Sequence, residues 1–204
     1  KGLLPKDVEI KKSGSIIKSI LKVYEIYQKK TKDLNAFDFG DLILFCVKLF
    51  EEHSDIRTIY QNNFKYILVD EFQDTNFIQN KWLNLLVNKD QNICCVGDDD
   101  QSIYSWRGAE IKNFLTFDKI YQNCKVFKLE QNYRSTKNIL ETASTLISNN
   151  TNRVGKKLWS SAIKGEPVKL NCYKTGKEEA QGIGDIIEHN LKKKYSLNDV
   201  SILV

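Results

Sequence analysis

The pattern of apolar and polar positions predicts helices at the start of the chain. Residues 1 to about 35 place apolar side chains at helical spacing, with lysines on the other face and Ser13 as a candidate cap. We interpret the lysine face as solvated; contact with phosphates is a weaker alternative. A second helix is expected after Asp38, a candidate N-cap, and its dense apolar content up to Phe50 predicts deep burial. The apolar positions of the first helix are Ile16, Ile20, Tyr24 and Tyr27.

Short apolar runs farther along the chain predict β-strands. The runs at 63–70 and 92–96 suit parallel strands that are buried on both faces, as in an open α/β sheet. A helix is expected between them over 74–88, with Trp82 in the core. Further elements are expected downstream: strands at 125–130, 168–173 and 200–204, and helices at 111–121, from the candidate cap Ser135 onward, and at 178–191.

Two adjacent carboxylates, Asp70 and Glu71, end the first predicted strand. Open α/β sheets bind ligands at the carboxyl ends of their strands. Asp70 could hold the magnesium of a bound nucleotide, directly or through water, and Glu71 could accept a proton from the attacking water. Both are candidate metal ligands in the acidic half of a phosphoryl-transfer site; a strand that ends in solvated acids is the alternative. The next residues, 73–75, could brace this site by hydrogen bonds or cap the following helix.

A polar loop, residues 97–109, follows the second predicted strand and reads Gly-Asp-Asp-Asp-Gln-Ser-Ile-Tyr-Ser-Trp-Arg-Gly-Ala. Gln101 could hydrogen-bond the terminal phosphate or the attacking water, and so distinguish ATP from ADP. Tyr104 and Trp106 could stack on unpaired bases, and Arg107 could stack or hold a carboxylate with its planar fork. The alternatives are a surface glutamine and aromatic side chains that pack in the core.

Three stretches, in this order, resemble helicase motifs two, three and four of superfamily 1, specifically of the UvrD/PcrA/Rep group. They are residues 66–76 (Tyr-Ile-Leu-Val-Asp-Glu-Phe-Gln-Asp-Thr-Asn), 97–109 and 129–135 (Leu-Glu-Gln-Asn-Tyr-Arg-Ser). The resemblance extends from about Asp38 onward and is weaker before it. It implies an α/β fold of RecA-like motor domains, each a parallel sheet with helices on both faces, plus a helical inserted subdomain. The expected parts are the end of the inserted subdomain (1–37), the second part of the first motor domain (38–130) and the first part of the second motor domain (131–204).

The resemblance also implies a function and further site residues. The expected activity is that of an ATP-dependent 3′–5′ DNA helicase or translocase, with ATP and magnesium as cofactors. Its partners would be single-stranded DNA, duplex junctions, and repair or replication proteins. Arg134 would be an arginine finger on the terminal phosphate, a group worth about 10³–10⁵ in rate elsewhere, and Tyr133 would stack on the adenine. A structural salt bridge near a helix start is the alternative for Arg134.

The phosphate-binding loop of such an enzyme is missing from the sequence. Its pattern requires Gly-Lys followed by Ser or Thr, and neither Gly155-Lys156 nor Gly176-Lys177 has that continuation. We expect the loop to lie upstream in a longer protein, with the later helicase motifs downstream, so the isolated chain should not hydrolyse ATP. The alternative is a naturally truncated, non-catalytic module that binds DNA or a partner helicase.

Composition narrows these expectations only slightly. The 204 residues, 41% of them hydrophobic, suffice for one or two domains, and a net charge of +5 permits a nucleic-acid partner without requiring one. No apolar run approaches the roughly 20 residues of a membrane span and no secretory signal is visible, so we expect a cytoplasmic protein without a membrane partner. The five cysteines are expected to be free thiols.

A basic segment, residues 150–165, also matches the family pattern. Contact with phosphate and a solvated surface loop are equally weighted interpretations of it. The matching positions are Asn152, Arg153, Lys157, Leu158 and Trp159.

Overall fold

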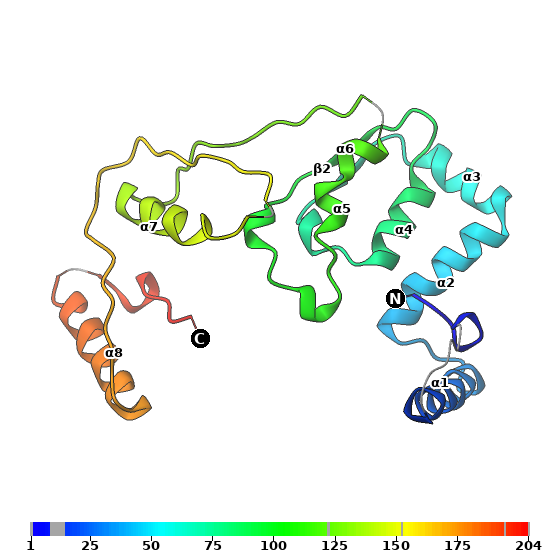
Figure 1. The fold of residues 1–204 in the computed structure, drawn as a ribbon, viewed down its shortest axis with the longest axis horizontal. Helices are drawn as coiled ribbons and strands as arrows, with labels where there is room; N and C mark the ends of the chain where they lie inside the picture. The colour runs from blue at the N-terminus through cyan, green and yellow to red at the C-terminus, as the bar shows by residue number, and fades with distance from the viewer. Residues whose placement is uncertain (1, 9–14, 122, 152, 194, 204) are drawn as a thin grey trace. The chain divides into compact units, whose positions relative to one another are not determined.

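The computed structural model describes residues 2–8, 15–121, 123–151, 153–193 and 195–203 (Figure 1). The chain divides into two compact units: Lys1–Glu130 with Ile147–Lys157, and Gln131–Leu146 with Leu158–Val204. Ser13, Asn152 and the last residue of the predicted strand 200–204 lie outside the described residues. Within the described ranges, no helix is both long and apolar enough to cross a membrane.

The first unit begins with three helices, α1 (Ser15–Asp33), α2 (Phe39–Glu52) and α3 (Ser54–Asn63). The predicted cap of α2 is confirmed, because the Asp38 carboxylate accepts a hydrogen bond from the Asp41 amide at 2.7 Å, and Asp41 reciprocates. Side chains of α1 bond to the same two acids, and these bonds attach α1 to the start of α2. The Tyr27 hydroxyl donates to Asp38, and the Gln28 amide donates to Asp41.

The main core of this unit lies between α2 and α4 (Phe77–Leu86), which pack on each other and on α3. Asn76 caps α4 by accepting a hydrogen bond from the Gln79 amide. The expected burial of α2 holds for one stripe only, since Phe39 and Leu42 on the remaining surface are exposed. Trp82 is half-buried. The buried side chains are Leu44, Val47 and Phe50 of α2 with Leu83 and Leu86 of α4.

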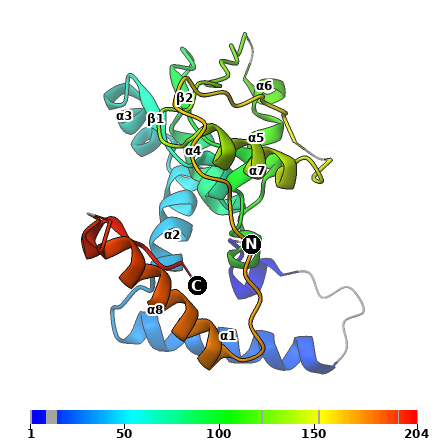
Figure 2. The same cartoon turned by 90° about the vertical axis from the view of Figure 1, so that its left-hand side faces the viewer.

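Two short parallel strands, β1 (Ile67–Val69) and β2 (Ile93–Cys95), pair side by side in this unit, as Figure 2 shows. Both lie at the centres of the predicted runs. The expectation that these strands are buried on both faces is wrong, because Leu68 is 79% exposed and its partner Cys94 is also exposed. Successive side chains of a strand point to opposite faces, and the described residues cover only one face of this sheet.

Aromatic side chains fill a second core behind β1. Phe72, just beyond the strand, is 2% exposed and lies 5.5 Å, between ring centroids, from Phe117. Two short helices, α5 (Lys112–Leu115) and α6 (Phe117–Ile120), replace the single helix predicted over 111–121. The break falls at Thr116, whose hydroxyl donates to the Lys112 carbonyl and so competes with the helical backbone.

The second unit contains α7 (Lys137–Ile147) and α8 (Gly176–Leu191). The prediction of Ser135 as the cap of α7 is wrong by one residue, because the helix begins at Lys137. The Asn132 side chain holds the preceding turn by accepting hydrogen bonds from the amides of Arg134 and Ser135. Helix α8 begins after Thr175, whose hydroxyl accepts a hydrogen bond from the Glu178 amide.

Three strand predictions are wrong for the described residues. The segments 125–130, 168–173 and 200–203 belong to no strand, and the strands found in the described ranges are β1 and β2 alone. An apolar run can favour extended backbone, but a strand also needs a neighbouring strand to satisfy its amides and carbonyls. The sequence of the run does not show whether a pairing strand lies beside it.

Candidate functional site

The turn after β1 carries the two predicted carboxylates, Asp70 and Glu71, and both are exposed. Asp70 accepts a hydrogen bond from the Glu71 amide at 2.9 Å. Glu71 adopts a left-handed backbone conformation, with φ 50° and ψ 41°, which is uncommon for a residue with a side chain. This sharp turn leaves both carboxylates in solvent while the next two residues, Phe72 and Gln73, enter the core.

Gln73 braces the site, which decides between the two roles that the sequence left open. Its side chain is only 1% exposed. Its Nε2 donates to Glu71 Oε2 at 2.8 Å, and its Oε1 accepts from the Asp98 amide at 3.0 Å. The cap of the following helix is instead Asn76. Gln73 therefore connects the end of β1 with the loop after β2.

Gly97 provides the room for this connection. A Cβ atom at position 97 would lie 2.6 Å from Gln73 Oε1 and 2.8 Å from a ring carbon of Phe114. Both neighbours belong to packed groups, so any side chain here would displace the bracing amide.

Asp98 is the centre of the loop after β2. Its carboxylate accepts from the Asp100 amide at 3.0 Å and from Gln101 Nε2 at 2.7 Å. Gln101 itself is exposed. A continuous series of hydrogen bonds thus runs from Glu71 through Gln73 and Asp98 to Gln101, joining the predicted base to the predicted phosphate sensor.

Asp98 also bonds to Lys156 of the same unit. Burial would raise the pKa of the Asp98 carboxyl, but hydrogen bonds from Lys156 and Gln101 outweigh that effect, and the pKa lies below its usual range. The Asp98 carboxylate is therefore charged at neutral pH and acts only as an acceptor.

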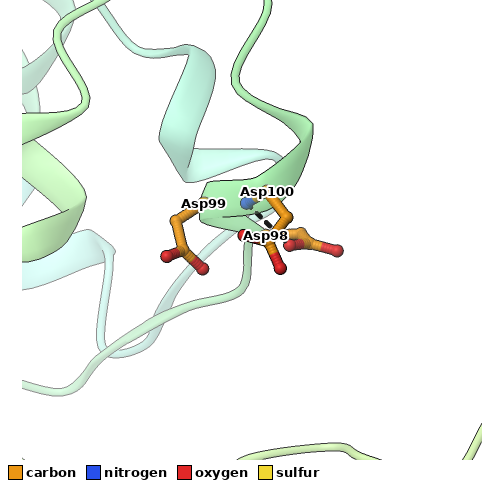
Figure 3. Close-up of side chains that lie close together, drawn as sticks. All are labelled: Asp98, Asp99 and Asp100. Carbon is orange, nitrogen blue, oxygen red and sulfur yellow. Dashed lines mark hydrogen bonds between the residues drawn. The ribbon is translucent and has the colours of Figure 1, made fainter. Parts of the chain in front are cut away.

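Asp98, Asp99 and Asp100 place carboxylate oxygens within 4.8 Å of one another (Figure 3). Such a group could share a cation, but donors from the basic segment already bond to these oxygens. Lys156 bonds to Asp98, Arg153 bonds to Asp100, and the Val154 amide donates to Asp99 at 2.6 Å. Side chains of the chain therefore supply the positive charge beside the triplet.

The fit of magnesium is better at the end of β1. Asp70 and Glu71 offer exposed carboxylate oxygens, which are the hard ligands that magnesium prefers. Nearby in sequence, Asp74 Oδ1 is buried without a hydrogen-bond partner among the described residues. This carboxylate-rich turn suits a hydrated divalent cation.

The predicted DNA-contact residues lie farther along the same loop, on the turn Ser105–Arg107 and at Tyr104, which precedes it. Arg107 stacks on both neighbouring rings, with Cζ 4.8 Å from the Trp106 centroid and 5.2 Å from the Tyr104 centroid. Trp106 is 74% exposed, so it does not pack in the core. In this structure Arg107 thus stacks on two side chains of its own loop.

Tyr133 and Arg134 lie in the second unit, on the turn before α7, and both are exposed. Tyr133 is 83% exposed. The backbone just before this turn is bonded to another segment of the unit, because the Asn132 amide donates to the Trp159 carbonyl at 2.8 Å. Both side chains are therefore available to a ligand, while their backbone is fixed.

Two parts of the site were not identified from the sequence. The sequence pattern assigns Asp98 no role of its own, and it pairs the basic segment with no acidic partner. The triplet of aspartates and the basic segment are complementary in charge, which is a signal that the sequence does contain. Their pairing, across 53 to 58 positions, requires the fold.

Comparisons with known proteins agree with the resemblance in the motifs. Residues 1–122 match the UvrD/REP helicase N-terminal domain, and residues 127–204 match the UvrD-like helicase C-terminal domain. The chain is 46% identical over 205 residues to the probable DNA helicase II homolog of Rickettsia conorii, covering 100% of this chain and 31% of that protein. It is 45% identical over 184 residues to the ATP-dependent DNA helicase PcrA of Bacillus subtilis, covering 89% of this chain and 25% of that protein. The chain thus spans less than a third of the length of these relatives.

Proposed function

This chain belongs to the UvrD/REP helicase family, and from that premise we propose that it serves an ATP-dependent 3′–5′ helicase or translocase acting on single-stranded DNA. The names of the relatives, DNA helicase II and PcrA, support a helicase. The observation that carries the proposal is the bonded series from Glu71 to Gln101, because it joins a carboxylate at one strand end to an amide after the next.

Each group in the first unit has a proposed chemical role. Glu71 accepts a proton from the attacking water, and Gln73 holds the carboxylate that does so. Gln101 leaves Asp98 to bond the terminal phosphate or the attacking water. Asp70 holds magnesium, with Glu71 as a further candidate ligand, and the ion when bound neutralises charge on the phosphates.

The second unit is proposed to contribute two groups to ATP. The exposed Arg134 acts as the arginine finger, stabilising charge that grows on the phosphate in the transition state. The exposed ring of Tyr133 stacks on the adenine. Their fixed backbone supports these roles, since a group that acts on a transition state must be positioned in advance.

The exposed aromatic turn is proposed as the DNA contact. Trp106 and Tyr104 stack on bases, each worth about 1–3 kcal/mol, and Arg107 adds a cation next to the stacked rings. Because Gln101 and Trp106 lie on one loop, nucleotide state and strand grip can be coupled through it. Repair and replication remain the proposed settings, with duplex junctions as additional substrates.

The proposed architecture is that of RecA-like motor domains. Residues 1–37 would end a helical inserted subdomain, residues 38–130 would continue the first motor domain, and residues 131–204 would begin the second. The parallel pairing of β1 and β2 and the position of the carboxylates after β1 support this assignment. Under the proposal, further chain would cover the open face of this sheet.

The experiment that tests the function has two measurements on the 204-residue chain. The first is binding of a fluorescent oligo-dT by anisotropy, comparing the chain with Trp106→Ala and with a control, Lys169→Met, at an exposed position of the second unit. We expect binding that Trp106→Ala weakens by about ten- to a hundredfold, as for one or more lost stacking contacts. Binding that Trp106→Ala leaves unchanged would contradict the DNA contact.

The second measurement is ATP hydrolysis with and without this DNA, beside Glu71→Gln. Because the phosphate-binding loop is not in the sequence, we expect no turnover by this chain alone. DNA-stimulated turnover that disappears in Glu71→Gln would support the role of Glu71 and overturn the expected inactivity. Binding without turnover is also what a non-catalytic module would give, so Glu71→Gln must then be repeated in a longer protein that hydrolyses ATP. Full activity of that variant would refute the role of Glu71.

A further inference from the structure

Within the basic segment, residues 153–157 contact the acidic loop after β2. Arg153 forms a two-pronged contact with Asp100, with Nε 2.8 Å from Oδ1 and Nη2 2.5 Å from Oδ2. The two side chains are only 18% and 13% exposed. Such paired, shielded contacts are stronger than ordinary surface ion pairs. In this structure Arg153 and Lys156 therefore bond to carboxylates of the same unit.

The same segment is also held from its other side. Lys128 Nζ donates to the Gly155 carbonyl at 2.6 Å, and Glu130 accepts from the Lys157 amide at 2.8 Å. Gly155 has a φ of 72°, in the left-handed region that glycine adopts without strain. These contacts give the segment one conformation, in which Arg153 and Lys156 both face the acidic loop.

We propose that residues 153–157 form a charge clamp that positions the loop after β2, residues 97–109 (the sensor loop), with Arg153 and Lys156 as positioning residues for Gln101. The inference rests on the proposed role of Gln101 and deepens it. The Asp98 carboxylate accepts a hydrogen bond from the Gln101 side chain and pairs with Lys156. Arg153 bonds to Asp100, two residues after Asp98 in the same loop. When Gln101 leaves for a phosphate, Lys156 still neutralises the carboxylate that remains.

The clamp has a particular place in the chain. It follows α7 after residues 148–152, and α7 follows the turn that carries Arg134. The loop after β2 is thus bonded to a segment that is connected through α7 to the proposed finger, although 53 positions separate Arg153 from Asp100. The clamp provides a covalent and electrostatic route by which a change near Arg134 can alter the hold on Gln101.

The test is a double-mutant cycle read by amide hydrogen exchange in NMR spectra of the whole chain, without nucleotide or DNA. The variants are Arg153→Met, Asp100→Asn and both together, and the probes are the Val154 backbone amide and the Gln101 side-chain amide. Each single change should speed exchange at Val154 by about tenfold or more, as expected for a lost hydrogen bond to a charged group. The double variant should add little to either single change.

Two comparisons separate positioning from general destabilisation. Lys156→Met should raise the pKa of the Asp98 carboxyl, followed by carbon chemical shifts, and should alter Gln101 exchange, whereas Lys156→Arg should restore both. Lys169→Met, which removes an exposed ion pair with Glu166, should change neither probe. Gly155→Ala keeps every charge but strains the backbone. It should therefore speed hydrogen exchange at the Val154 amide, as Arg153→Met does.

Effects of Arg153→Met and Asp100→Asn that simply multiply would overturn the clamp, as would a Gln101 amide that responds to none of these changes. If Arg153→Met does not fold, the Lys156 pair and Gly155→Ala decide the question by the same probes. Because the exchange measurements contain no nucleotide or DNA, a negative result in them refutes the clamp alone. Failure of the proposed function would appear separately, in the DNA-binding and hydrolysis measurements.

Discussion

Replacing Gln73 with leucine removes the brace between the two strand ends while keeping a side chain of similar size in the core. Three interactions disappear: the bond to Glu71 at 2.8 Å, a longer bond to Asp74 at 3.4 Å, and the bond from the Asp98 amide at 3.0 Å. Glu71 is exposed, so its carboxylate can turn to water, and we assign that loss only about 0.5–1 kcal/mol. The Asp98 amide is partly buried and loses its acceptor, which costs about 1–3 kcal/mol. The unfolding free energy of the first unit should therefore fall by about 1.5–4 kcal/mol in total.

The assay must report on the first unit alone. Trp82 of α4 lies in that unit, and the other two tryptophans, Trp106 and Trp159, can be replaced by phenylalanine in every protein compared. Urea unfolding is then followed by Trp82 fluorescence. The matched control is Gln101→Leu, the same replacement at an exposed position whose side chain bonds to Asp98, where a loss below about 1 kcal/mol is expected.

A fall below about 0.5 kcal/mol for Gln73→Leu, within the range of ordinary surface substitutions, would refute the reasoning. It would mean that the bonds through Gln73 contribute nothing beyond the space that the side chain fills. An equal loss in both glutamine variants would refute it differently, because burial would then not matter.

Further expectations concern the same unit. Asp38→Ala should lower its unfolding free energy by about 1 kcal/mol through loss of the cap of α2, which the same urea titration measures; no change would contradict the capping role. Because the folded pKa of Asp98 is lowered, its contribution to stability is present above the unfolded pKa, 3.8, and is lost as the pH falls through the folded value. Acid titrations should therefore show less loss between pH 5 and pH 2, roughly the range of carboxyl titration, in Asp98→Asn than in the parent chain. Gly97→Ala should displace Gln73 and destabilise the unit, seen as a lower urea midpoint; an unchanged midpoint would show that the neighbours yield easily. In a longer protein that hydrolyses ATP, Gln101→Ala should abolish stimulation by DNA, and normal stimulation would contradict the coupling.

Local sequence was enough to predict features whose partners lie a few residues apart. The cap at Asp38 depends on Asp41, three positions away, and the turn after β1 follows from carboxylates that end an apolar run. The exposure of Leu68 could not be predicted, because an apolar run does not reveal which face of its sheet has a cover. The strand centres were therefore predictable, and their burial was not.

The same distinction applies to the site. The sequence offered Gln73 two roles because its deciding partner, the Asp98 amide, lies 25 positions away. Similarly, charge alone could not say whether Arg153 would meet a phosphate or Asp100. The proposed roles of Asp70 and Glu71 came from two carboxylates that end an apolar run, and the role of Arg134 came from the family resemblance.

The parallel pairing of β1 with β2 also sets an order of events in folding. Parallel strands cannot be joined by a tight hairpin turn, so the backbone from residue 70 to residue 92, with α4 in it, must bring the two strands into register. The entropic cost of that closure comes before the pairing energy is gained. Gln73 and Asp98 meet only once the strands have paired, so the proposed catalytic arrangement forms late. Substitutions that weaken the Gln73 contact should therefore chiefly speed unfolding and leave the rate of folding almost unchanged.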